Sequence, residues 1–181
     1  MEFVVGCDLE EFKRYYKTLR DLHNYYKTLG LQDVSVGELG VEEEYWVTKD
    51  PCHLIVWREG NEIVGHAIWH ETSTDEHKRG DPRDEDDKEM LRGLLGGKKD
   101  SIVELHEVWL RKKYRGRGYG NRFFEFFEDF SRKRGYESIV YYTDNDAAMA
   151  VCRKRGYKEG FLAKENWHVF CFLLSAPGSI S

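Results

Sequence analysis

The sequence predicts an α/β fold, organised as a single domain over residues 1–181. Strand-like and helix-like apolar patterns alternate along the chain, and a glycine-rich run separates one strand from the helix after it. A chain of 181 residues, 40% of them hydrophobic, can bury a substantial core without disulfides or a metal ion. The sequence shows neither an apolar run of membrane-spanning length nor the pattern of a signal peptide.

The first half of the chain predicts strands and helices bounded by capping and turn residues. In order they are a strand at 3–5, a long helix at 12–29, a second helix at 41–47, and strands at 54–58 and 63–69. Asp8 with Glu11 fits a capping box for the long helix, and Gly30 ends it. Gly60 and Asn61 suit a tight turn between the two later strands.

Residues 72–100 stand apart because they are crowded with charge, including the acidic run at 84–89. One interpretation is a solvated, mobile insertion between two strands. The spacing of four apolar residues also predicts a short amphipathic helix inside it, at Met90, Leu91, Leu94 and Leu95.

The second half of the chain predicts the order strand, glycine-rich turn, helix, strand, helix, strand. The strands are expected at 102–110, 138–143 and 167–174. The core face of the first helix is marked by Phe123, Phe126, Phe127 and Phe130. Asp144 or Asn145 caps the second helix, and Gly135 and Gly156 end the two helices.

The glycine-rich turn reads Arg115-Gly116-Arg117-Gly118-Tyr119-Gly120. Its glycines permit backbone conformations closed to other residues and the close approach of a ligand. The helix start directs N–H groups and the positive end of a dipole at the turn, which predicts an anion site, most plausibly for a pyrophosphate. The turn has neither the Gly-Lys-Ser/Thr of a Walker A motif nor the spacing of the dinucleotide fingerprint.

This stretch resembles the GNAT superfamily of N-acyltransferases, which use acetyl-CoA or a related acyl-CoA. The family signature Arg/Gln-x-x-Gly-x-Gly/Ala is matched by residues 115–120. A second family block, Asn-x-x-Ala-x-x-x-Tyr-x-Lys-x-Gly-Phe, is matched at Asn145, Ala148, Lys154, Gly156 and Tyr157. The chain departs from that block at the family's tyrosine, where it has Cys152.

The resemblance implies a mixed, largely antiparallel central sheet with helices on both faces, and acetyl-CoA as the cosubstrate. Backbone amides of 115–120 would hold the pyrophosphate, and the N–H of Leu110 would donate to the thioester oxygen. Asn145 would contact the pantetheine arm, with a plain helix N-cap as its structural alternative. The implied cofactor site comprises Val108, Trp109, Leu110, Arg115, Gly116, Arg117, Gly118, Tyr119, Gly120, Asn145 and Cys152.

Acyl transfer to an amine needs a base, because an aliphatic ammonium has a pKa near 10.4. In the family the base is often a carboxylate on the strand before the turn, and Glu104 falls there, with His106 two residues later. Strand alternation places both side chains on one face, whereas Glu107 points away unless a bulge reverses the order. The structural alternatives are a salt-bridged edge carboxylate for Glu104 and a structural histidine for His106.

The family's tyrosine usually protonates or stabilises the departing CoA thiolate. Cys152 either takes this role or is small apolar packing on a helix, and we favour packing. Water or a nearby phenol, Tyr142 or Tyr157, would then meet the thiolate, or the thiolate leaves unassisted.

We therefore predict an enzyme, an acetyl-CoA-dependent N-acetyltransferase, that moves an acetyl group directly to a primary amine in a ternary complex. The acceptor is a small molecule or a protein amine, and residues 72–100 are then interpreted as an acidic lid that attracts a cationic amine. The alternative is a CoA-binding regulatory or interaction module on the same scaffold, which the departure at Cys152 keeps open.

Composition adds expectations about partners and location. The four cysteines are scattered, which favours reduced thiols in the cytoplasm over a disulfide framework, and we expect no metal site. A net charge of −5 argues against nucleic acid as the main partner, and we expect no membrane partner. The oligomeric state stays open, with a homodimer as one alternative.

Overall fold

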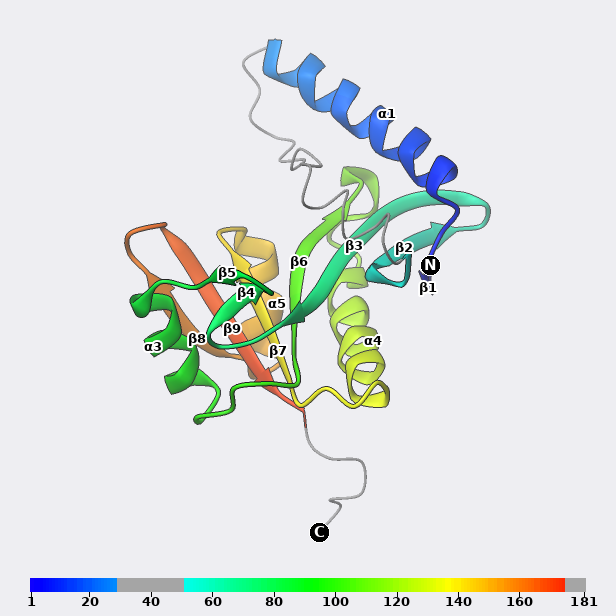
Figure 1. Ribbon diagram of the computed structural model, residues 1–181. Coiled ribbons are helices and arrows are strands. Elements are labelled where there is room, and N and C mark those ends of the chain that lie inside the picture. The colour runs from blue at the N-terminus through cyan, green and yellow to red at the C-terminus, as the bar shows by residue number, and fades with distance from the viewer. Residues whose placement is uncertain (29–50, 175–181) are drawn as a thin grey trace. The chain divides into compact units, whose positions relative to one another are not determined.

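The computed structural model describes residues 1–28 and 51–174 (Figure 1). Within them, seven strands form one mixed sheet in the order β1-β2-β3-β6-β7-β9-β8, and β4 and β5 form a separate hairpin. The pairs β1–β2, β2–β3, β7–β9 and β8–β9 are antiparallel, whereas β6 and β7 are parallel. The predicted α/β fold with a mixed, largely antiparallel sheet is confirmed.

The strands are β1 (Glu2–Val5), β2 (Leu54–Glu59), β3 (Glu62–Thr72), β4 (Glu76–Lys78), β5 (Asp81–Pro82), β6 (Ile102–Leu110), β7 (Ser138–Thr143), β8 (Lys158–Leu162) and β9 (Trp167–Leu173). The helices are α1 (Leu9–Thr28), α3 (Glu85–Leu94), α4 (Tyr119–Lys133) and α5 (Asp146–Lys154), with short 3-10 turns at Pro51–His53 and Lys112–Tyr114. The helix expected at 41–47 lies outside the described residues. None of the described helices has the length and apolar character needed to cross a membrane.

The chain divides into two compact units. Unit 1 comprises Met1–Ile68 and Glu107–Tyr114, and unit 2 comprises Trp69–His106 and Arg115–Ser181. Strands β3 and β6 each contribute residues to both units. The single-domain organisation stays a prediction, and each unit is described by itself.

Unit 1 has a core in which α1 packs on the sheet. Its buried cluster is Phe12, Tyr15, Tyr16, Leu19, Leu54, Val56, Ile63, Ile68 and Trp109. The predicted cap is present, since the Glu11 amide donates to Asp8 Oδ1 over 2.8 Å. Gly65 on β3 is required by close packing, because a Cβ there would lie 2.6 Å from the Trp109 carbonyl oxygen.

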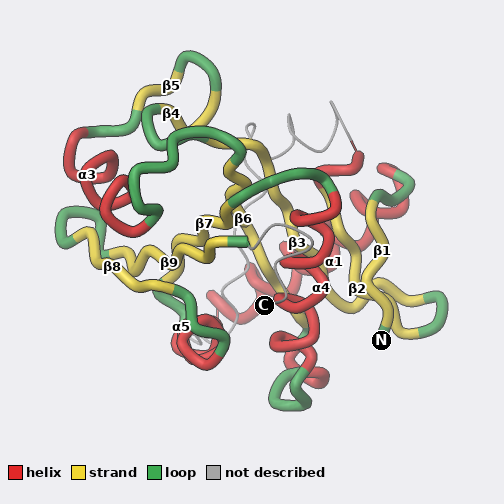
Figure 2. The backbone as a smooth tube through the Cα atoms, turned by 90° about the horizontal axis from the view of Figure 1, so that it is seen from below, coloured by secondary structure: helices red, strands yellow, loops and turns green. Residues whose placement is uncertain are grey.

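Unit 2 places α3 and α5 on opposite faces of the β8–β9 part of the sheet (Figure 2). The core beneath α3 contains Leu91, Leu95, Ile102, Val140, Leu162, Val169 and Cys171. On α4, the buried phenylalanines are Phe123, Phe124 and Phe127. The spacing of the phenylalanines predicted the burial of Phe123 and Phe127.

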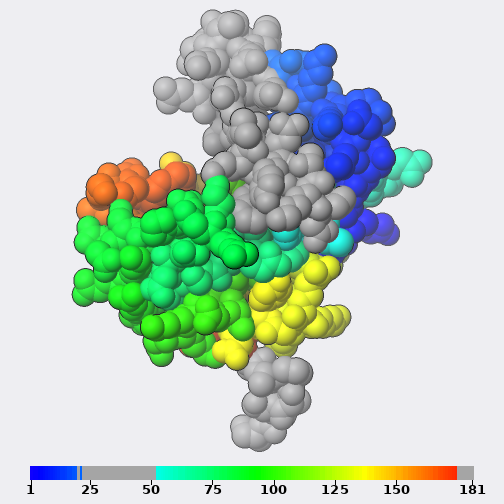
Figure 3. Space-filling model, viewed as in Figure 1, coloured from blue at the N-terminus to red at the C-terminus, as the bar shows by residue number. Residues whose placement is uncertain are grey.

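Residues 72–100 are folded rather than extended into solvent. They form the β4–β5 hairpin and the predicted amphipathic helix, α3, which Asp84 caps by accepting a hydrogen bond from the Asp87 amide over 3.1 Å. The solvated interpretation is wrong for Arg83, which is only 2% exposed. Figure 3 shows residues of this segment, in green, over a broad part of the visible face of unit 2.

Strand β8 was not predicted from the sequence. Its residues Lys158–Leu162 are mostly exposed and include a glycine, so they lack the apolar alternation of a half-buried strand. Pairing with β9, from Lys158↔Cys171 to Leu162↔Trp167, is what makes the segment a strand.

Candidate active site

Two predicted catalytic side chains, Glu104 and His106, lie on the same face of β6 in unit 2. His106 Nδ1 is 3.7 Å from Glu104 Oε1, as strand alternation predicted. The Glu104 side chain is 8% exposed, whereas that of His106 is 34% exposed. Pairing of β6 with β7 runs from Ile102↔Ser138 to Leu105↔Tyr141, and His106 follows directly after this paired stretch.

The Glu104 carboxylate is surrounded by cationic and imidazole groups. Arg83 Nη2 donates to Glu104 Oε2 over 3.1 Å. His70 Nε2 lies 3.8 Å from Oε1, and His77 Nδ1 lies 4.0 Å from Oε2. Burial alone would raise the pKa of the Glu104 carboxyl, but the surrounding imidazoles and the Arg83 guanidinium hold this pKa well below its ordinary value. Glu104 is therefore a stable anion.

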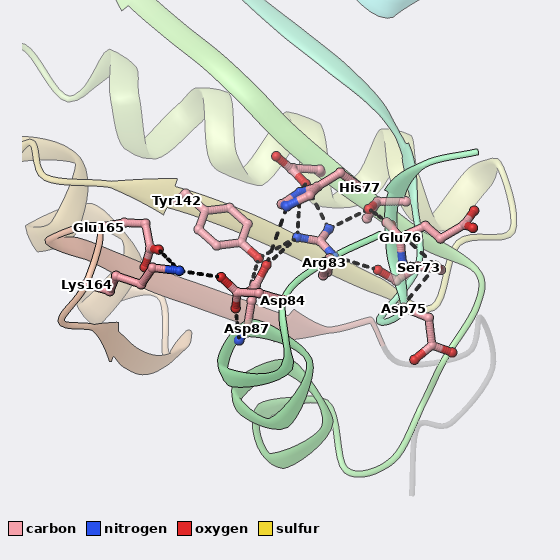
Figure 4. A network of polar contacts seen from close by, with 12 residues as sticks. Ser73, Asp75, Glu76, His77, Arg83, Asp84, Asp87, Tyr142, Lys164 and Glu165 are labelled. Atoms are coloured by element: carbon pink, nitrogen blue, oxygen red, sulfur yellow. Dashed lines mark hydrogen bonds and ion pairs between the residues drawn. The ribbon is translucent and has the colours of Figure 1, made fainter. Parts of the chain in front are cut away.

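Arg83 is the centre of this network, which Figure 4 shows. Its guanidinium donates to Asp87 Oδ2 over 2.9 Å and to Tyr142 Oη over 2.8 Å, in addition to Glu104. Further bonds reach Thr72 Oγ1 over 2.6 Å, His77 Nδ1 over 2.8 Å and the Ser73 carbonyl over 2.9 Å. One buried cation thus joins residues 72–100 to β6 and β7. The sequence analysis missed Arg83, whose one local signal is its placement four residues before Asp87.

The contacts of His70 define which of its ring nitrogens faces Glu104. Its Nδ1 lies 2.9 Å from the Glu71 carbonyl oxygen, which can only accept, so Nδ1 carries the proton and Nε2 is directed at Glu104. Burial lowers the pKa of His70 more than the Glu104 charge raises it. The side chains of His70, Glu104 and His106 thus converge. One ring nitrogen of each histidine and one carboxylate oxygen of Glu104 all lie within 4.8 Å of one another.

A cavity of about 360 Å³ opens onto this cluster in unit 2. Its lining residues are His77, Asp84, Asp87, Glu104, Leu105, His106, Tyr142, Leu162, Glu165 and Trp167. Carboxylates come from residues 72–100, from β6 and from the turn between β8 and β9. Leucine and tryptophan side chains form the apolar part of the wall. The arrangement suits a small polar molecule with a positive charge.

The glycine-rich turn has the backbone geometry that its sequence predicted. Gly116 has φ +74° and Gly118 has φ +79°, both in the left-handed region that favours glycine. Gly118 is the N-cap residue of α4, and a glycine has no side chain to accept a capping hydrogen bond. An amide-lined helix start of this kind is suited to an anion.

Comparison with known families gives a match over most of the chain. Residues 16–157 match the sequence model of the acetyltransferase (GNAT) family. The chain belongs to the GNAT family. A probable N-acetyltransferase 14 of Xenopus tropicalis is 38% identical over 58 residues, which are 31% of this GNAT chain and 28% of that relative. The match therefore spans less than a third of the relative's length.

Solved structures share the fold of this GNAT chain at low sequence identity. A GNAT-family acetyltransferase from Listeria monocytogenes superposes with a TM-score of 0.62 at 12% identity, covering 96% of this chain and 94% of that one. A mosquito arylalkylamine N-acetyltransferase-like protein superposes with a TM-score of 0.61 at 15% identity, covering 96% of this chain and 100% of that one.

The other predicted cofactor residues of the GNAT chain are distributed over both units. Val108, Trp109 and Leu110 belong to unit 1, and the Trp109 side chain is 6% exposed within that core. In unit 2, Asn145 Oδ1 accepts from the Ala148 amide over 3.1 Å, so the predicted N-cap is confirmed. The contact of Asn145 with a pantetheine arm stays a prediction.

Cys152 is fully buried on α5 of the GNAT chain. Burial raises the pKa of its thiol to about 12, so the group stays protonated and enclosed near neutral pH. The two alternative phenols are engaged elsewhere: Tyr142 donates to Asp87 Oδ1 over 2.7 Å, and Tyr157 donates to Glu128 Oε1 over 3.2 Å. These facts favour packing as the role of Cys152.

A second buried polar cluster, in unit 1, also escaped the sequence analysis. His66 Nδ1 lies 3.0 Å from Tyr15 Oη, and His66 Nε2 contacts the Glu107 carboxylate. Tyr16 Oη reaches the same carboxylate over 3.5 Å. Burial raises the pKa of the Tyr15 hydroxyl above its ordinary value. The cluster satisfies polar groups that α1, β3 and β6 would otherwise bury without partners.

Proposed function

We propose that this protein is an acetyl-CoA-dependent N-acetyltransferase that transfers the acetyl group directly to a primary amine. The observation that carries the proposal is that strand β6 contributes two side chains to the cavity and leads along the chain into the glycine-rich turn. Strand β6 lines the cavity with Glu104 and His106, and it ends five residues before the glycine-rich turn begins. Membership of the GNAT family supports acyl transfer in general.

The donor side of the proposal rests on backbone groups. Acetyl-CoA supplies the acetyl group as a thioester, and the amides at the start of α4 hold its pyrophosphate, with Arg115 and Arg117 adding positive charge. Both arginines are exposed. The Leu110 N–H donates to the thioester oxygen and stabilises the negative charge that develops there.

We assign the proton transfer to His106, with Glu104 as the group that supports it. A carboxylate whose pKa lies well below its ordinary value is a weak base, whereas an imidazole suits proton transfer near neutral pH. His106 accepts the proton of the acceptor ammonium, directly or through water. Glu104, ionised and 3.7 Å away, stabilises the imidazolium that results.

The chemical step is then a direct displacement. The neutral amine nitrogen attacks the thioester carbonyl carbon, a carbon–nitrogen bond forms, and the carbon–sulfur bond breaks. The nitrogen loses its second proton to solvent as the amide forms, and CoA leaves as a thiolate that takes a proton from solvent, which needs no acid from Cys152. The reducing cytoplasm stays part of the proposal and is consistent with the scattered cysteines, which form no disulfide among the described residues.

The test is release of free CoA thiol with a panel of primary amines, for the wild type and for His106→Asn. A general base contributes roughly 10²–10⁴-fold, so kcat should fall in that range while acetyl-CoA affinity is kept. Activity should recover at high pH, where more of the amine is already neutral. The matched control is His168→Asn. His168 Nδ1 lies 2.8 Å from Glu159 Oε1, so this variant also removes an imidazole beside a carboxylate, but neither residue lines the cavity.

Wild-type turnover in His106→Asn would refute the assignment of the base. Tight acetyl-CoA binding with no turnover of any amine would instead favour the CoA-binding regulatory module. Failure to bind acetyl-CoA at all would refute both functions.

A further inference from the structure

The cavity of unit 2 has a deep carboxylate pair and an outer carboxylate pair. Glu104 and Asp87 are 8% and 7% exposed, and buried Arg83 bonds to both. Asp84 and Glu165 are 49% and 38% exposed, and both line the same cavity. The ten lining residues include these four carboxylates and no lysine or arginine.

The outer pair already holds an ammonium group. Lys164 Nζ lies 3.3 Å from Asp84 Oδ2 and 3.6 Å from Glu165 Oε1, and its side chain is 71% exposed (Figure 4). The two carboxylates come from elements far apart in the sequence, the N-cap of α3 and the turn between β8 and β9. A flexible, exposed lysine is an ion-pair partner that a ligand ammonium can replace at little cost.

Part of the cavity wall is apolar. Leu105 and Leu162 line the cavity, and Trp167 lines it while 40% exposed. Such a surface suits the methylene groups of a ligand. Lysine and arginine side chains behave in the same way, because their methylene groups pack on apolar surface while the charged end stays in water.

We propose that the acceptor is a diamine, a primary amine with a second positive charge on an aliphatic spacer. This inference rests on the proposed function and names the acceptor of that same cavity. The reacting amine enters beside His106, and the spacer lies along Leu105 and Leu162. The distal ammonium replaces Lys164 between Asp84 and Glu165. The carboxylate of Asp84 is ionised, because the Asp87 amide and Lys164 lower its pKa.

The kinetic test compares butylamine with diaminobutane and diaminopentane. The wild type should use the best diamine with a higher kcat/KM than butylamine. Asp84→Asn and Glu165→Gln should each lower kcat/KM for the diamines by about twofold to fivefold, the range of an exposed ion pair, and lower kcat/KM for butylamine less. Lys164→Met should raise kcat/KM for the diamines, because it removes the ammonium that competes with the substrate.

Matched controls come from another exposed ion pair of unit 2, Lys98 with Glu137. Lys98→Met and Glu137→Gln should leave the diamine-to-butylamine ratio unchanged. Equal kcat/KM for butylamine and the diamines in the wild type would overturn the inference while leaving the acetyltransferase proposal intact. The same ratio in wild type and Asp84→Asn would also overturn it.

A binding measurement at equilibrium tests the diamine inference independently of whether the protein catalyses acetyl transfer. Calorimetry should show that diaminobutane binds the full chain more tightly than butylamine, and that Lys164→Met strengthens this binding. Absence of diamine binding to the wild type refutes the inference whether or not the protein acetylates any amine.

Discussion

Arg83 Nη2 donates to Glu104 Oε2 over 3.1 Å, and both side chains are buried. The same guanidinium is 2.9 Å from the Asp87 carboxylate, so two buried carboxylates share one buried cation. Residues 72–100 are thereby tied to β6 at the point where Glu104 faces the cavity. The arrangement keeps Glu104 ionised and at a fixed distance from His106.

We expect Arg83→Met to destabilise the protein by about 3–5 kcal/mol, because it leaves two buried carboxylates without their cation. Urea denaturation followed by circular dichroism measures this change. The control is Arg92→Met, which removes an exposed ion pair with Asp75 (2.8 Å) and should cost about 1 kcal/mol or less. Equal losses in the two variants would contradict a special role for the buried arginine.

The depressed pKa of Glu104 predicts how stability depends on pH. Its folded-state pKa lies well below the ordinary value of 4.5, so the unfolded chain binds the proton first as the pH falls. The stabilisation is fully present above that ordinary value and is lost as the pH falls below it, toward the folded-state pKa. Glu104→Gln should therefore be less stable at neutral pH but lose less free energy of unfolding between about pH 5 and about pH 3.

The matched control for this pH profile is Glu137→Gln, an exposed carboxylate beside Lys98. It should keep the wild-type dependence on pH. An unchanged slope in Glu104→Gln would show that other groups account for the loss of stability in acid.

Gly118→Ala and Gly135→Ala separate backbone strain from ligand binding. The two glycines have φ +79° and +85°, and an added Cβ meets nothing within 4 Å at either. Each alanine should therefore cost about 1–2 kcal/mol of stability. Only Gly118→Ala should weaken acetyl-CoA binding, by about tenfold or more in calorimetry, because only Gly118 lies at the start of α4. Equal affinity in the two variants would contradict the placement of the pyrophosphate at the turn.

Cys152→Ala should keep turnover within about tenfold of the wild type, a barrier change of about 1.4 kcal/mol. The thiol is fully buried with its pKa raised to about 12, so it is a poor source of a proton for a departing thiolate. Steady-state kinetics with saturating amine measure the effect, and Cys152→Tyr tests whether the family's residue adds anything. A thousandfold loss in Cys152→Ala with intact CoA binding would instead make the cysteine the acid.

Local features of the structure could be predicted because neighbouring residues encode them. The turn at 115–120, the cap at Asn145 and the apolar face of α4 depend on backbone preferences and on spacing within a few residues. The placement of Glu104 and His106 on one face needed only the two-residue period of a strand.

The interaction partners of these residues could not be predicted in the same way, because they lie on segments that are distant in the sequence and come together only in the folded chain. Arg83 and Glu104 are 21 positions apart, and Arg83 and Tyr142 are 59 apart, so no local pattern pairs them. Strand β8 likewise depends on its register with β9 rather than on its own composition. The sequence therefore specifies which groups can accept a proton or hold an anion. Their ionisation, burial and access depend on distant residues, because charge and solvation act through space and not along the chain.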